Sequence, residues 1–141
     1  MGVSALLGSP VLAGACGAPS SPSATTLSRV ETETVTAGGL SVTFSGPRTV
    51  VAGSAEDLTA TWVATRAFGA VGPASVDYGD GTGEVFAHAR FCRASPVAAR
   101  SSQTFVHRYR RPGSYVVVLV VADGCAQGDR ATVRLHVGVT G

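Results

Sequence analysis

The chain has 141 residues, enough for one domain with a core and short for two. Hydrophobic residues make up 45% and charged residues only 14%, which excludes a chain kept unfolded by its charge. The net charge is only +2, and a nucleic-acid-binding domain carries a larger, clustered basic excess, so we expect no nucleic-acid partner. All 11 basic residues are Arg, and Lys, Ile and Asn, whose codons are A/T-rich, are absent, which indicates a GC-rich genome.

The N-terminal segment is uncharged through residue 28 and contains the apolar run Ala5–Ala15, followed by Cys16. The run is too short to span a bilayer and has the length of a signal-peptide apolar core. The small residues at 13–15 before Cys16 resemble the lipobox of bacterial lipoproteins, in which such residues precede a cysteine that is acylated. We therefore expect a leader at 1–16, lipidation of Cys16, export and a membrane anchor. Cleavage that leaves Cys16 unmodified, and a disordered leader with no processing, stay open as alternatives.

A Ser-, Pro- and Thr-rich stretch follows the leader, and we expect a flexible tether over residues 17–38. Within it, residues 29–36 alternate between two side-chain sets, a pattern that fits either tether or a loosely held edge strand.

The rest of the chain consists of short alternating runs separated by Gly and Pro, with no sustained helical period. The expected strands are 40–44, 58–62, 75–78, 84–87, 103–109, 114–122 and 131–137. About seven strands over roughly 100 residues predict an all-β, immunoglobulin-like antiparallel β-sandwich.

The three cysteines fit an exported protein. Acylation of Cys16 accounts for the odd thiol and leaves Cys92 and Cys125 to form a disulfide. The alternative is two buried free thiols. No Cys-x-x-Cys or Cys/His metal spacing is present, and we expect no cofactor.

Two motifs carry a family resemblance. Val76-Asp-Tyr-Gly-Asp-Gly-Thr82 resembles the W-D-F-G-D-G-T signature of PKD (polycystic kidney disease) domains. His107-Arg-Tyr109-Arg-Arg-Pro112-Gly113-Ser-Tyr115 resembles their H-x-Y-x-x-P-G-x-Y, and the run ending at Asp123 resembles V-T-L-T-V-T-D. The resemblance covers 39–139 and implies a PKD-type sandwich. Val76 stands where the family usually has Trp, and we expect Trp62 to fill that part of the core.

The first motif is expected to form a tight structural turn. Gly79 and Gly81 permit positive φ, the Asp80 carboxylate accepts backbone N–H groups, and Thr82 adds a hydroxyl contact. A calcium site built from Asp77, Asp80 and Thr82 is the alternative, but the motif offers too few oxygen ligands for that cation, so we favour the structural role.

The second motif is also interpreted as structural. Pro112-Gly113 fits a type II turn, because Pro suits its second position and Gly its third. We expect Tyr109 and Tyr115 to pack at the edge of the core, and His107 to be hydrogen-bonded rather than a ligand.

Two surface features are candidates for contacts. The strand 115–121 is apolar on both faces, so Val116, Val118 and Val120 form a possible partner patch; the high strand propensity of Val is the explanation we favour. Arg108, Arg110 and Arg111, with arginines at 90, 93 and 100, offer a basic surface for anionic envelope polymers or lipid head groups; scattered solvated charges are the simpler interpretation.

No nucleophile, metal-protease or phosphate-loop motif occurs, so we expect no enzyme activity. The resemblance implies a cell-surface module that makes protein–protein or protein–carbohydrate contacts, or acts as a spacer. A glycan-binding accessory module of an envelope enzyme system, and less favourably a hydrolase, are the alternatives.

Overall fold

The computed structural model describes residues 29–53, 58–66, 71–86, 99–124 and 129–141. Cys16, Cys92 and Cys125 lie outside these ranges, so the lipidation site and the disulfide stay predictions. The described part of the chain contains no helix that could span a lipid bilayer.

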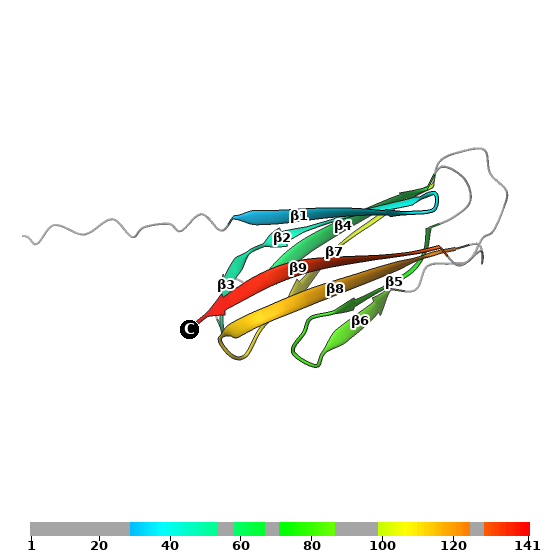
Figure 1. Cartoon of the computed structure of the whole chain (residues 1–141). Helices are drawn as coiled ribbons and strands as arrows, with labels where there is room; N and C mark the ends of the chain where they lie inside the picture. Colours follow the sequence, from blue (N-terminus) through cyan, green and yellow to red (C-terminus); the bar gives the residue numbers. More distant parts are fainter. Residues whose placement is uncertain (1–28, 54–57, 67–70, 87–98, 125–128) are drawn as a thin grey trace, which may run out of the picture.

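Nine strands in two facing sheets make up the described residues (Figure 1). In chain order they are β1 (Val30–Ala37), β2 (Leu40–Pro47), β3 (Thr49–Val51), β4 (Leu58–Arg66), β5 (Val71–Asp77), β6 (Gly83–Phe86), β7 (Ala99–His107), β8 (Gly113–Asp123) and β9 (Arg130–Thr140). One sheet has the order β1-β2-β4-β7, and the other β3-β9-β8-β5-β6. The all-β sandwich predicted from the sequence is confirmed, with nine strands in place of about seven.

The two additional strands are both edge strands. β3 is only three residues long and pairs in parallel with β9, whereas the other strand pairs are antiparallel. β1 pairs with β2 along its whole length through a tight turn in which Gly38 has φ +57°. Residues 30–37, which the sequence analysis placed in the tether, therefore form an edge strand, the alternative it left open. Their weak alternation follows from a mostly exposed strand.

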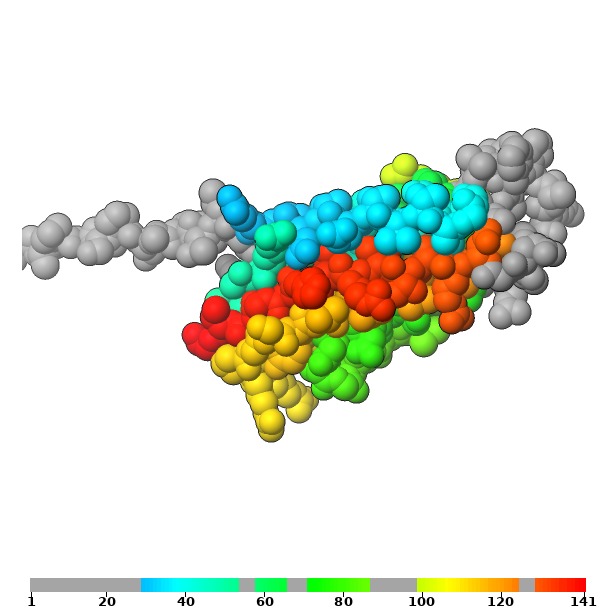
Figure 2. All heavy atoms as spheres, viewed as in Figure 1, coloured from blue at the N-terminus to red at the C-terminus, as the bar shows by residue number. Residues whose placement is uncertain are grey.

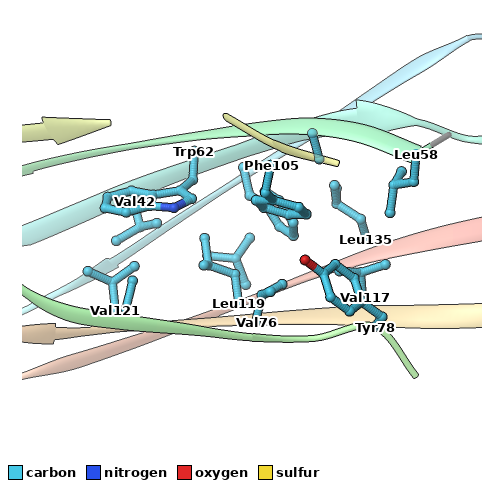
Figure 3. Close-up of a cluster of buried hydrophobic side chains, with 14 of the residues drawn as sticks. Val42, Leu58, Trp62, Val76, Tyr78, Phe105, Val117, Leu119, Val121 and Leu135 are labelled. Carbon is cyan, nitrogen blue, oxygen red and sulfur yellow. The ribbon is translucent and has the colours of Figure 1, made fainter. Parts of the chain in front are cut away.

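The core lies between the two sheets and is filled by alternate residues of the central strands (Figure 3). Trp62 of β4 and Phe105 of β7 face Leu119 and Val121 of β8 in this close-up. Trp62 is 0% exposed, which confirms the expectation that it is a core residue. The inward set predicted for the last strand is likewise buried: Ala131, Val133, Leu135 and Val137.

The sheet order brings the two sequence motifs together. β5 pairs with β8, and the β5–β6 turn and the β7–β8 connection emerge at the same end of the sandwich, the end that also holds the C-terminus (Figure 1). The motifs are some 25 residues apart in the chain, but this topology makes their side chains neighbours.

Candidate functional site

The turn between β5 and β6, residues 79–82, is held by its own polar groups, and we call it the motif turn. Oδ1 of Asp80 accepts the backbone N–H of Thr82 at 3.0 Å and the Thr82 hydroxyl at 2.6 Å. Oδ1 of Asp77 accepts the backbone N–H of Gly79 at 2.8 Å, and the Tyr78 N–H donates to the Thr82 carbonyl at 3.0 Å. The contacts expected of Asp80 and Thr82 are confirmed.

Two glycines allow this turn to close. Gly79 and Gly81 have φ of +79° and +89°, in the region that residues with a Cβ rarely adopt. A Cβ on Gly79 would also lie 2.7 Å from the carbonyl oxygen of Val116 in β8, whereas a Cβ on Gly81 would point into open space. Gly79 therefore serves both the turn and the close approach of the neighbouring strand.

His107, the last residue of β7, ties the second motif to the first. Its Nε2 lies 2.8 Å from Oδ2 of Asp80, and the two side chains are largely buried. The imidazole stacks on the ring of Tyr78, with centroids 3.7 Å apart and planes 5° apart, and meets Tyr109 edge-on at 4.7 Å. His107 is a hydrogen-bonded structural residue, as its place in the motif predicted.

The tyrosines of the second motif pack as predicted at the edge of the core. Tyr109 is 2% exposed, and its hydroxyl donates to the backbone carbonyl of Tyr78 at 2.9 Å. Tyr115 is half-buried, stacks on Tyr109 at 4.4 Å, and donates its hydroxyl to the carbonyl of Arg111 at 3.0 Å. The chain from 109 to 115 is therefore pinned to the body of the sandwich.

The predicted type II turn at Pro112-Gly113 is wrong. A type II turn requires positive φ at its third residue, and Gly113 is not among the glycines with positive φ. Gly113 instead begins β8 and pairs with Val139 of β9. Its missing side chain leaves room for Tyr115, because a Cβ there would lie 3.3 Å from the Tyr115 ring.

The surroundings of this cluster keep Asp80 charged and keep Tyr78 and Tyr109 protonated. Burial on its own would raise the pKa of Asp80, but the hydrogen bonds from Thr82 and His107 outweigh it and hold that pKa below the ordinary aspartate value. Burial raises the pKa of Tyr78, and its hydroxyl, which donates to Glu84 Oε1 at 2.8 Å, is held protonated further by that carboxylate. Burial likewise raises the pKa of Tyr109.

The carboxylates expected to hold calcium in the alternative interpretation are engaged within the turn. Asp77 and Asp80 accept hydrogen bonds from Gly79, Thr82 and His107. In the described part of the chain, no group of three or more His, Cys, Asp or Glu side chains is placed to hold a metal ion.

A concavity of about 560 Å³ lies between the motif turn and the β7–β8 connection, and we call it the arginine pocket. Its lining residues are Asp80, Thr82, His107, Arg108, Arg110, Arg111 and Tyr115. Sequence reasoning identified the three arginines as a cluster but did not place them opposite Asp80 and Thr82. That placement depends on the pairing of β5 with β8, which no local pattern specifies.

The predicted partner patch lies on the outer face of its sheet. Val116 is 37% exposed, and Val118 and Val120 are half-buried. Val118 and Val120 line a second concavity of about 550 Å³, together with residues of β5 and β6. Val85 of β6, which no sequence pattern singles out, lines the same concavity and is 76% exposed.

Comparison with protein families matches residues 26–137 to the PKD domain. This chain belongs to the PKD domain family. Among solved structures it is similar to the PKD domain of an M14-like peptidase from Thermoplasmatales archaeon SCGC AB-540-F20, with a TM-score of 0.53 and 20% identity. That match covers 79% of this chain and 100% of the other, and it supports the fold. A search among curated proteins finds no match. PKD domains are typically non-catalytic and extracellular.

Proposed function

We propose that this chain is a non-catalytic PKD module held at the cell surface by a lipid on Cys16. In this role it contacts a protein or a carbohydrate of the cell envelope, or spaces another domain from the membrane. The leader 1–16 and a tether ending before β1 at Val30 support the anchored arrangement. The single observation that carries the non-catalytic role is the state of the Asp80–His107 pair.

A catalytic His–Asp pair works on a nucleophile or a substrate group beside the imidazole. Among the described residues that line the cavity at His107 there is no Ser or Cys, and the Thr82 hydroxyl is bound to Asp80. Here the imidazole is stacked on Tyr78 and its Nε2 is bound to Asp80, whose other oxygen is bound by Thr82. The pair joins the motif turn to the end of β7, which supports a structural role over acid–base chemistry.

Metabolic labelling with a fatty-acid analogue tests the anchor. We expect label on the wild-type chain, none on Cys16→Ser, and full label on the matched control Cys92→Ser. An unlabelled wild type would overturn the lipid anchor. Thiol counting on the unreduced wild-type protein tests the remaining pair, and free thiols at Cys92 and Cys125 would overturn the disulfide.

Co-sedimentation with isolated native envelope tests the contact role. We expect the purified chain to sediment with the envelope and to leave the envelope polymers uncleaved. Release of cleaved sugar or peptide that depends on His107 would support the hydrolase alternative instead. Sedimentation only in the presence of an envelope enzyme would favour the accessory-module alternative.

A further inference from the structure

The arginine pocket has two walls from distant parts of the chain. Asp80 and Thr82 of the motif turn form one wall, and residues 108–111 with Tyr115 form the other. Figure 2 shows the yellow β7–β8 connection projecting from the molecule beside the green residues of β5 and β6. The pocket volume, about 560 Å³, lies within the range of small-molecule sites, roughly 300–1,000 Å³.

The charge of the pocket is strongly positive. Arg108, Arg110 and Arg111 line it and are exposed, and Asp80 is the one carboxylate among the described lining residues. Asp80 already accepts three hydrogen bonds from Thr82 and His107, so its two oxygens are engaged within the protein. The lining therefore favours an anion.

The backbone that carries the arginines is held in place. Tyr115 donates its hydroxyl to the Arg111 carbonyl at 3.0 Å, and the Gly53 N–H donates to the Tyr109 carbonyl at 3.3 Å. Tyr109 is itself buried and bonded to Tyr78. Because the backbone is fixed in advance, binding costs less ordering entropy than it would on a loose loop.

The chemistry of the lining points to the class of ligand. A guanidinium group is a planar fork that matches the two oxygens of a carboxylate or a phosphate. None of the described lining residues is aliphatic, so the pocket offers no aliphatic subsite for a peptide side chain. Sugar hydroxyl groups can form hydrogen bonds with these polar side chains. Because the two walls project on either side of the pocket, a small soluble ligand fits between them better than the flat surface of a bilayer.

We propose that the arginine pocket binds an acidic sugar unit, with its carboxylate or phosphate group held by Arg110 and Arg111. This inference rests on the proposed contact role and gives it a ligand class and a site. Thr82 on the opposite wall and His107 at the end of β7 then complete the lining around the sugar.

Titration of the full chain with galacturonate oligomers, glucose 6-phosphate and neutral glucose oligomers tests the proposal. We expect binding of at least one acidic sugar, no binding of the neutral oligomers, and a loss of about tenfold or more in affinity for Arg110→Ala/Arg111→Ala. The matched control is Arg100→Ala/Arg134→Ala, which removes the same charge from exposed positions outside the pocket lining and is expected to keep wild-type affinity.

Each other outcome overturns the proposal. Equal losses in the two double variants would show only diffuse attraction between charges. Binding to vesicles with 30% phosphatidylglycerol but to neither acidic sugar would assign the pocket to lipid head groups. Acidic-sugar binding unaffected by Arg110→Ala/Arg111→Ala would remove the pocket but leave the contact role of the domain intact. If the chain binds no acidic sugar yet still sediments with envelope, the ligand class is wrong and the proposed function stands.

Discussion

The two walls of the arginine pocket use their polar groups in opposite ways. On the motif turn, both oxygens of Asp80 accept hydrogen bonds from the protein itself, and Gly79 lies against the backbone of β8. On the β7–β8 connection, Tyr115 holds the backbone through the Arg111 carbonyl, while Arg110 and Arg111 are exposed.

Because of this difference, one wall contributes mainly to the stability of the fold and the other mainly to ligand binding. A polar group bonded within the protein contributes to folding, and its loss leaves its former partners unsatisfied. An exposed cation contributes little to folding and remains available to a ligand. Substitutions on the two walls are therefore expected to change different measured quantities.

The largest expected effect comes from the glycines of the motif turn. Gly79→Ala is expected to cost about 3 kcal/mol in the free energy of unfolding, because positive φ and the clash with the Val116 carbonyl combine. Gly81→Ala, with positive φ but open space, is expected to cost only about 1 kcal/mol. Urea unfolding measures both, and equal losses would show that the approach of β8 does not constrain the turn.

The next effect concerns Asp80 and pH. Asp80→Asn is expected to cost about 1–2 kcal/mol at pH 7, because charged hydrogen bonds to Thr82 and His107 are lost. The folded-state pKa of Asp80 is lowered, so its contribution is complete above the unfolded-state value, about 3.9. It is lost as the pH falls through that value toward the folded-state pKa.

The difference in unfolding free energy between wild type and Asp80→Asn is therefore expected to shrink between pH 6 and pH 3. Glu33→Gln, an exposed carboxylate on β1, is the matched control and is expected to change stability little at either pH. A difference for Asp80→Asn that is independent of pH would contradict the charged role of this side chain.

A smaller effect is expected on the outer face of β8. Replacing Val116, Val118 and Val120 together with Thr keeps high strand propensity, so the loss of stability should stay within about 1 kcal/mol. Calorimetry measures this loss. Acidic-sugar affinity is expected to match that of wild type, since none of the three residues lines the arginine pocket. A several-fold loss of affinity would place the ligand on this face instead.

Much of the fold follows from local sequence pattern, because the alternation of apolar and polar residues in the central strands indicates which face of each strand is buried. The residues predicted to face the core on β2, β4 and β9 are buried. The sequence leaves β1 open between tether and edge strand and does not predict β3, because edge strands bury too little to alternate clearly. Gly113 was misassigned because a Pro-Gly pair signals a turn, while here the glycine accommodates the Tyr115 ring.

The candidate site was predictable only in part. The hydrogen bonds between Asp80 and Thr82 were predictable from the motif, because the two residues are only two positions apart in the chain. The pairing of Asp80 with His107 and the position of the arginines depend on contacts across 27 residues or more. Such contacts are set by the order of strands in the sheet, which a single sequence does not specify.

The most direct test of the division between the two walls is a titration of the ¹⁵N-labelled full chain with a galacturonate oligomer, followed by amide chemical shifts. We expect the largest shifts on residues 108–111, Thr82 and Tyr115, and no change at Val118, Val120 and the outer residues of β9. Shifts centred on the outer face of β8, or no shifts at saturating concentrations of the oligomer, would contradict the division between the two walls.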